Sequence, residues 1–328
     1  MRGHDMNGYE DDLQLLLALA ADEGREKVLF GECLDTAQKV LPDYLKGDTF
    51  PKIYLEFPLT GEPFLEVTVG YGPVSDTEEN NMLKWVSDKA KIDKGVCCGY
   101  ELDLKNGVPI RPAIHFQPRR SHKLVEPFLS IIGEHDKAPL YHSMTERLPE
   151  SWQPAMFGLF RGRPGSPLRI GGYLSRNEID ECIRDKERIP QIFERAGFKA
   201  YDGEMIEQLD SLMSVLPDLA GYQFDIFPDG SLGDVFAIDL HLPAMRSGEM
   251  HAFFEEGDGA GLARLLSKWE IIDRRFDKVL DMAFAGAIPV QDGLRAYVLR
   301  PDWIKVRWTN RKLQPAKMYV LTTAGLIK

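Results

Sequence analysis

The chain has 328 residues, of which 44% are hydrophobic and 28% are charged, and its formal net charge is −11 at pH 7. This composition is that of an ordinary soluble globular protein with enough apolar material for a large core. The acidic balance argues against general binding to nucleic acid or to an anionic membrane surface. The length fits two average domains or one large domain, so length alone does not decide between them.

The N-terminus and the cysteines argue against further classes of protein. No apolar run reaches the length of a membrane span, and the polar, acidic N-terminal stretch has no signal-peptide core. We therefore expect a cytoplasmic protein. The four cysteines are Cys33, Cys97, Cys98 and Cys182. They form no CxxC motif and no Cys/His cluster with zinc spacing, so a metal site built on sulfur is not expected.

Strand-like runs occur five times in pairs, each pair joined by a short turn-rich link. The pairs are residues 52–59 with 63–72, 97–104 with 108–117, 155–162 with 167–174, 222–227 with 232–242, and 303–309 with 316–323. Links such as KNG and PDGS supply the Gly, Asn and Asp residues that hairpin turns require. Because no linker or low-complexity segment interrupts this order, residues 1–328 are predicted to form a single domain.

Helical patterns fill the gaps between the strand pairs. Helices are predicted at 11–21, 32–44, 76–91, 122–134, 175–197 and 204–216, followed by one long helix at 259–284. Acidic residues in the first turn favour the helix at 76–91, and Gly197 is a typical helix stop. The stretches 162–167 and 243–258 are predicted to be loops.

One face of every predicted hairpin is apolar, and the other carries charge. In the strand at 303–309, for example, Lys305 and Arg307 alternate with Ile304 and Val306. Two architectures fit this pattern, and in both of them helices cover the apolar faces. In an open α+β layer, the polar face meets water. In a closed barrel, the polar face lines a wet interior. The polar faces hold Tyr, Arg, His, Gln and isolated carboxylates, which favours an α/β fold with a ten-stranded antiparallel barrel inside a ring of helices.

This pattern resembles the ABBA-fold aromatic prenyltransferases, in particular the dimethylallyltryptophan-synthase-like branch. There, a segment similar to PFLEVTVGYG carries a glutamate that holds the indole N–H, and later strands carry basic-x-Tyr pairs that cradle the diphosphate. The resemblance places that glutamate at Glu66, and AKMYV supplies one basic-x-Tyr pair as Lys317 and Tyr319. The sequence departs from the pattern in three segments. At the basic-x-Tyr positions, PAIHFQP carries Ala113 and His115, and FAIDLHL carries Asp239 and His241. RIGGY has both residue types, as Arg169 and Tyr173, but their spacing differs from that of the pattern.

The resemblance implies transfer of an allylic prenyl group from a prenyl diphosphate to an indole or phenol acceptor, free or in a peptide, without a required cofactor. Basic side chains would stabilise the leaving diphosphate, tyrosines would shield the allyl cation, and a carboxylate would orient and deprotonate the acceptor. The diphosphate candidates, all on predicted strands, are Arg111, Arg161, Arg169, Lys305, Arg307 and Lys317. The shield candidates are Tyr54, Tyr173 and Tyr319, the acceptor-binding base is Glu66, and possible proton carriers are His115 and His241.

The same residues also fit less specific roles. The basic residues can be solvated, or can pair with Glu56, Glu101, Asp225 and Asp239, and Glu66 can pair with Lys52 or another cation of the lumen. Asp225 and Asp239 can approach each other across the fourth hairpin and hold Mg²⁺. The alternative function is a non-catalytic accessory protein that binds a peptide or small ligand on the same barrel, and an open α+β protein of another role is a third possibility.

Overall fold

The computed structural model describes residues 7–22, 24–45, 50–71, 81–93, 95–105, 112–119, 121–215, 219–290 and 292–327. The strands are β1 (Lys52–Pro58), β2 (Glu66–Tyr71), β3 (Cys97–Asp103), β4 (Ala113–Gln117), β5 (Pro154–Leu159), β6 (Leu168–Leu174), β7 (Ala220–Ile226), β8 (Leu232–His241), β9 (Phe284–Val290), β10 (Gly293–Thr309), β11 (Lys312–Leu313) and β12 (Lys317–Ile327). The α-helices are α1 (Asn7–Ala21), α2 (Cys33–Val40), α3 (Asn81–Ile92), α4 (Val125–Ile131), α5 (Ala138–Arg147), α6 (Arg176–Arg184), α7 (Arg188–Ala196), α8 (Gly203–Met213), α9 (Ser247–Glu255), α10 (Ala260–Lys268) and α11 (Arg275–Leu280).

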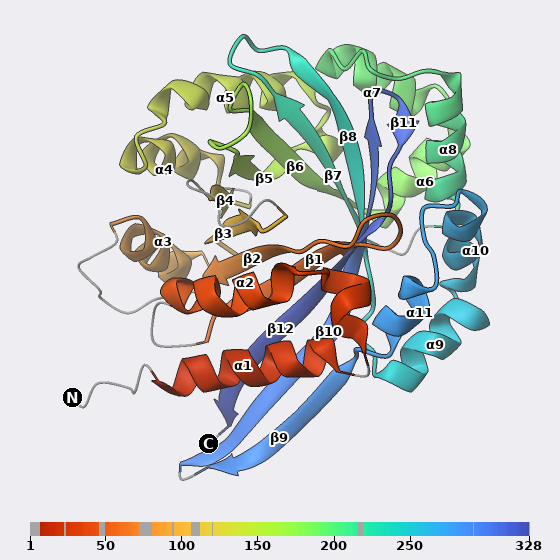
Figure 1. Cartoon of the computed structure of the whole chain (residues 1–328). Helices are drawn as coiled ribbons and strands as arrows, with labels where there is room; N and C mark the ends of the chain where they lie inside the picture. Colours follow the sequence, from red (N-terminus) through yellow and green to blue (C-terminus); the bar gives the residue numbers. More distant parts are fainter. Residues whose placement is uncertain are drawn as a thin grey trace.

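Ten of the strands close into a barrel. The order of hydrogen-bonded neighbours is β10-β12-β1-β2-β3-β4-β5-β6-β7-β8, and β8 pairs with β10 to complete the ring. The pairs β1–β2, β3–β4, β5–β6, β7–β8 and β10–β12 are the five predicted hairpins, and all are antiparallel. Helices surround the ring on its outside (Figure 1). The closed barrel is therefore confirmed, and the open layer is wrong.

The apolar face of each strand points outward and packs beneath the helices. Phe57 of β1 meets Phe30 edge-on, with 5.2 Å between the ring centroids. Phe116 of β4 stacks on Phe128 of α4 at 4.0 Å, and Phe236 of β8 is inaccessible to solvent. Because side chains alternate along a strand, burial of these residues turns the charged residues of the same strands into the lumen. The hydrophobic core thus lies between barrel and helices.

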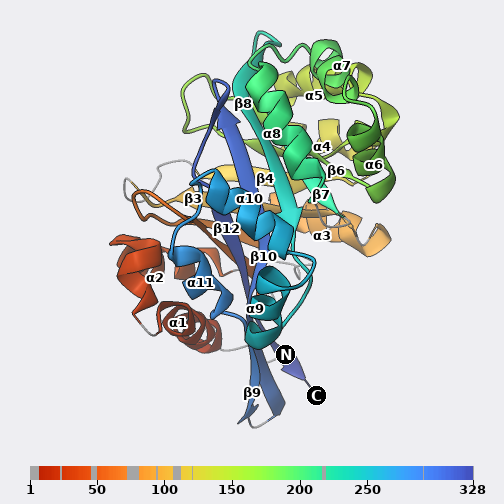
Figure 2. The ribbon, with the colours of Figure 1, turned by 90° about the vertical axis from the view of Figure 1, so that its right-hand side faces the viewer.

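The long helix predicted at 259–284 is wrong. The segment forms α10 and α11, and the chain breaks between them where Glu270 has a φ of 58°. Asp273 then accepts a hydrogen bond at 2.8 Å from the backbone N–H of Arg275, which starts α11. Strand β9 begins at Phe284, where the helix was predicted to end, and pairs with β10. Together with the ends of β10 and β12, it projects beyond the barrel (Figure 2).

Three other predictions of helices and loops need correction. The helix predicted at 175–197 is two helices, α6 and α7, and the predicted loop at 243–258 contains α9. Helix α5 was not predicted at all. The first five residues of the helix predicted at 76–91 lie outside the described residues, and α3 begins at Asn81. Of the helices in the described part of the chain, none is long and apolar enough to cross a membrane.

Candidate functional site

The barrel lumen contains a cavity of about 640 Å³. Its wall includes four glycines from neighbouring parts of the ring, namely Gly70, Gly99, Gly158 and Gly171. A Cβ atom at Gly99 would lie 2.7 Å from the carbonyl oxygen of Val69, so only glycine fits this backbone approach. A Cβ at Gly158 would lie 2.9 Å from the imidazole of His115. No side chain projects from these glycines into the cavity.

The opposite side of the cavity is lined by an aromatic wall made of Tyr54, Trp303 and Tyr319. The Trp303 ring stacks on Tyr319 with a centroid distance of 4.6 Å and lies 4.6 Å from the ring of Tyr54. His241 extends the wall at 5.5 Å from Trp303, and Tyr173 follows at 5.8 Å from His241. Burial raises the pKa of Tyr54, Tyr173 and Tyr319, so these hydroxyls stay protonated at neutral pH.

Next to the aromatic wall, the lumen holds a group of acidic and basic side chains that we call the charge cluster. Its carboxylates are Glu56, Glu66, Glu101, Asp225 and Asp239, and its cations are Arg163, Arg169, Lys305 and Lys317. The charge cluster lines a narrow cleft that also contains Arg307. Among the described residues, each of its four cations has a carboxylate within 4 Å. Of the predicted diphosphate candidates, Arg169, Lys305 and Lys317 are therefore paired with carboxylates.

The tightest contacts of the charge cluster are to Lys317 and Arg169. Lys317 Nζ lies 2.9 Å from Glu56 Oε1 and also donates a hydrogen bond to Glu66. Arg169 binds Asp225 through two hydrogen bonds of 2.7 and 3.0 Å. Although burial raises the pKa of Asp225, the charge of Arg169 and these hydrogen bonds lower it overall. Such bidentate pairs fix both side chains in place.

Lys305 connects the charge cluster to the aromatic wall. It donates a hydrogen bond to the hydroxyl of Tyr319, and its Nζ lies 4.8 Å from the centroid of that ring. Its carboxylate partners are more distant, because Glu56 and Asp239 each approach Nζ only to 3.9 Å. Lys305 also lines the large cavity. It is thus a cation that a ligand in the cavity can reach.

Glu56 and Glu66 are directly opposite each other on β1 and β2. Two carboxylates in such a position repel each other, so the pKa values of the two groups differ. Burial and the neighbouring Glu56 and Glu101 raise the pKa of Glu66 to about 7, despite the opposing charge of Lys317. Burial also acts on Glu56, but the charges of Lys317 and Lys305 outweigh it and lower its pKa. Glu66 is therefore the carboxyl that gains a proton near neutral pH.

The structure places seven predicted site residues around the large cavity. They are Tyr54, His115, Arg169, Tyr173, His241, Lys305 and Tyr319. Glu66, Arg307 and Lys317 instead line the narrow cleft of the charge cluster. Arg161 lies in the turn after β5, not on a strand as predicted, and lines neither space. Arg111 falls outside the described residues.

Sequence reasoning missed Trp303, Arg163 and Arg119. Trp303 lies two residues before Lys305 on β10, so strand alternation could have placed it in the lumen. Arg163 lies in the β5–β6 link and reaches Glu101, 62 residues earlier, at 3.2 Å. Arg119 follows β4, and its guanidinium lies 5.3 Å from the centroid of Tyr173. No local pattern marks either arginine, because each contact depends on the closed ring.

The described residues do not favour a metal site. Asp225 is bound to Arg169, while Asp239 accepts a hydrogen bond at 2.5 Å from Gln223. Within the described ranges, no group of three or more His, Cys, Asp or Glu side chains is arranged to hold a metal ion. The predicted magnesium pair therefore has other partners.

Comparisons with known proteins bear on the fold. A scan with protein-family models found no match, and a search of curated proteins found none. Among solved structures, NotF prenyltransferase is similar with a TM-score of 0.56 at 10% sequence identity, over 98% of this chain and 95% of that chain. NotF in complex with brevianamide F and DMSPP gives 0.54 at 12% identity, over 100% and 97%. AnaPT from Neosartorya fischeri gives 0.47 at 11% identity, over 98% and 93%.

The closed ring of ten strands, its five antiparallel hairpins and the surrounding helices define an ABBA or PT-barrel protein. The similarity to NotF along nearly the whole of both chains supports the same assignment. The chain therefore has the fold of the ABBA-type aromatic prenyltransferases, as its strand pattern predicted. At these sequence identities the similarity shows the fold alone.

Proposed function

We propose that the chain transfers an allylic prenyl group from a prenyl diphosphate to an indole or phenol acceptor, free or within a peptide. The C1–O bond of the donor breaks, its electron pair leaves with the diphosphate, and the acceptor ring bonds to the allylic carbon. The protein must stabilise the leaving group, shield the allyl cation from water and hold the ring close to it.

The observation that carries this proposal is that the aromatic wall adjoins reachable cations within one cavity. Lys305 and Arg169 both line the cavity, and Lys305 is bonded to Tyr319 of the aromatic wall. A diphosphate held by Lys305 and Arg169 would release its allyl cation against the faces of Tyr319 and Trp303, which attract cations. A cavity of about 640 Å³ lies within the usual range for small-molecule sites.

The proposal requires no cofactor, because lysine and arginine supply the positive charge next to the leaving diphosphate. NotF has been solved with brevianamide F and DMSPP, which is consistent with an aromatic acceptor in this fold. The aromatic acceptor is proposed to occupy the space between the aromatic wall and the glycines of the opposite wall.

The test is incubation of the purified chain with dimethylallyl diphosphate and tryptophan, tyrosine or short aromatic peptides, with and without Mg²⁺. Mass spectrometry should detect acceptors that have gained one dimethylallyl group, and a heat-denatured sample is the control. Geranyl and farnesyl diphosphate extend the test to longer donors. Absence of product with every donor would contradict the proposal.

Trp303→Ala is expected to slow prenyl transfer about 30-fold. A cation–π contact in a desolvated site is worth about 2 kcal/mol, and each 1.36 kcal/mol changes a rate tenfold. Loss of the indole also opens the aromatic wall to water, so a larger share of donor should end as free prenyl alcohol. The measurement is the ratio of prenylated acceptor to alcohol.

Trp303→Phe is the matched control, because it keeps an aromatic face on β10 next to Tyr319. It is expected to retain most of the rate and the parent product ratio. Equal rates and equal product ratios for Trp303→Ala and the parent chain would remove Trp303 from the proposed cation site.

A second candidate function is a non-catalytic protein that binds a small ligand or peptide in the cavity. One observation favours it: the cations of the charge cluster are already paired with carboxylates, so a diphosphate must displace those contacts. Calorimetric titration with inorganic diphosphate and with aromatic peptides separates the two functions. Binding of peptides without any binding of diphosphate would favour the accessory role.

A further inference from the structure

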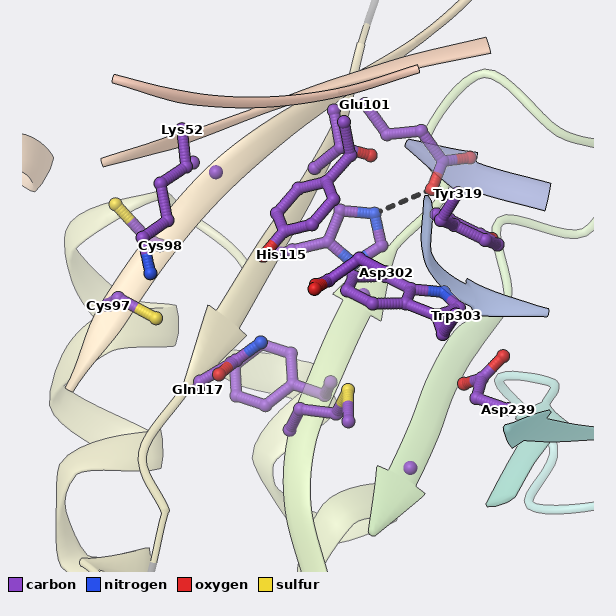
Figure 3. A pocket seen from close by; sticks show the side chains of 18 of the residues that line it. Lys52, Cys97, Cys98, Glu101, His115, Gln117, Asp239, Asp302, Trp303 and Tyr319 are labelled. Carbon is purple, nitrogen blue, oxygen red and sulfur yellow. Dashed lines mark hydrogen bonds and ion pairs between the residues drawn. The ribbon is translucent and has the colours of Figure 1, made fainter. Parts of the chain in front are cut away.

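One titratable pair in the cavity wall is well placed to move a proton. His115 Nε2 and Glu101 Oε2 are 2.8 Å apart on neighbouring strands β4 and β3 (Figure 3). The His115 side chain is 26% exposed to the cavity, whereas that of Glu101 is 9% exposed. Glu101 is held from its other side by Arg163 at 3.2 Å. The carboxylate is therefore fixed, and the imidazole is the more exposed member of the pair, although both residues line the cavity.

The hydrogen bond determines which nitrogen of His115 is free. Burial raises the pKa of Glu101, but the hydrogen bond and charge of His115 and the charges of Arg163 and Arg169 outweigh it and keep Glu101 ionised. An ionised carboxylate only accepts hydrogen bonds, so Nε2 carries the proton in neutral His115. Nδ1 then has a free lone pair. Nδ1 and Cε1 both lie 2.9 Å from the position that a Cβ atom of residue 158 would occupy, so only glycine at 158 leaves room for this edge of the imidazole.

The ring of strands places His115 across the lumen from the aromatic wall. Strand β4 is five strands away from β10 in either direction around the ring β10-β12-β1-β2-β3-β4-β5-β6-β7-β8. An acceptor ring between the two sides would thus have Trp303 and the allyl cation on one side and His115 on the other. The edge-on contact of His115 with Phe160, at 5.6 Å, holds the imidazole in this orientation.

The other candidate bases are less suitable. Glu66 is bonded to Lys317 and lines the narrow cleft rather than the large cavity. His241 contacts Tyr173 and Trp303 in the aromatic wall, and no carboxylate among the described residues accepts a hydrogen bond from it. His115 alone among the three combines contact with the cavity and a carboxylate partner.

We propose that Nδ1 of His115 removes the proton from the acceptor ring after prenylation, with Glu101 as its positioning residue. This inference rests on the proposed function. The new bond joins a ring atom to the allylic carbon and leaves a cationic ring that still bears its hydrogen. The electron pair of that C–H or heteroatom–H bond returns to the ring, the proton passes to Nδ1, and the imidazolium is stabilised by Glu101.

The decisive experiment uses His115→Gln and an acceptor deuterated at the prenylated position. A general base contributes a factor of about 100 or more, so kcat should fall by about that much while the KM for the donor changes little. Deprotonation should then limit the rate, so a primary deuterium isotope effect should appear in His115→Gln that the parent lacks. Glu101→Gln should show the same isotope effect with a smaller loss of kcat.

Two further variants keep the test decisive. Gly158→Ala retains both members of the pair but pushes the imidazole aside, and it should also show the isotope effect. His251→Gln is the matched control, because His251 forms a similar 2.8 Å contact with Asp281 outside the barrel. It should behave as the parent. Added imidazole should restore part of the kcat of His115→Ala.

Full activity of His115→Gln, or lost activity without an isotope effect and without rescue by imidazole, would overturn the role of His115. A parent chain that transfers no prenyl group would instead overturn the proposed function, and the base role with it. The two failures are distinguished by the parent assay.

Discussion

Lys317→Met is expected to lower the free energy of unfolding by about 3–5 kcal/mol at pH 8. The Lys317 side chain is only 9% exposed, and its ammonium group contacts both Glu56 and Glu66. Without it, Glu56 keeps Lys305, at 3.9 Å, and a hydrogen bond with Tyr319, while two buried carboxylates face each other. Guanidinium unfolding of the parent and the variant measures the difference.

The exposed Lys312 on β11 provides a control for loss of a lysine. Lys312→Met should change stability by no more than about 0.5 kcal/mol. If repulsion between unpaired carboxylates is the cause, then Glu56→Gln and Glu66→Gln added to Lys317→Met should restore most of the loss. A loss below about 1 kcal/mol for Lys317→Met would show that the charge cluster is solvated.

The barrel could be predicted from the sequence because it depends on local features, namely the alternation of side chains within each strand and the short links between paired strands. Side chains alternate with a period of two in any strand, so Lys305 and Arg307 must face away from Ile304 and Val306 wherever the strand lies. Short links joined each strand to its partner. Strand β9 was missed for the opposite reason: its residues are apolar throughout and do not alternate with polar ones, and only pairing with β10 makes the segment extended.

The sequence could predict which side chains of the candidate site face the lumen, but not which residues they contact there. Alternation correctly turned Glu66, Lys305 and Lys317 into the lumen. It could not show that Glu66 faces Glu56, which requires the register of β1 against β2, or that Lys317 binds both from the far end of the chain. Alternation alone therefore does not decide whether the basic side chains are free to bind a diphosphate or are paired with carboxylates. The structure pairs Arg169, Lys305 and Lys317 with carboxylates.

The departures from the basic-x-Tyr pattern have a common physical result. His115 bonds Glu101, and Asp239 approaches Lys305 while it accepts a hydrogen bond from Gln223. Both residues therefore belong to pairs that carry less positive charge than a basic-x-Tyr pair would. Whether a diphosphate binds in this lumen depends on how readily the carboxylates give up their cations, and Glu66 is the one closest to losing its charge.

Glu66→Gln is expected to raise the free energy of unfolding at pH 8 by on the order of 3 kcal/mol. The pKa of Glu66 is raised from 4.5 to about 7 in the folded chain, and one pKa unit corresponds to 1.36 kcal/mol. Because the folded chain holds this proton more tightly, the stability that it contributes is complete below pH 4.5 and is lost as the pH rises through 7. Glutamine keeps the neutral form at every pH. Unfolding experiments from pH 4 to 8 should show the variant and parent converging at low pH.

The same substitution is expected to tighten binding of inorganic diphosphate about tenfold at pH 8. Neutral glutamine removes one negative charge from the cleft that Lys317 shares with Lys305 and Arg169, and the recovered positive charge is worth at least one charge-assisted hydrogen bond of about 1.5 kcal/mol. Glu62→Gln is the control, because Glu62 forms a 2.8 Å pair with Lys105 on the surface and should leave diphosphate affinity unchanged. Unchanged or weaker affinity in Glu66→Gln would mean that Glu66 does not compete with diphosphate for Lys317. Tighter binding would mean that ionised Glu66 weakens diphosphate binding and that its protonation relieves this effect. Glu66 would then control donor binding and would not act as the base that deprotonates the acceptor.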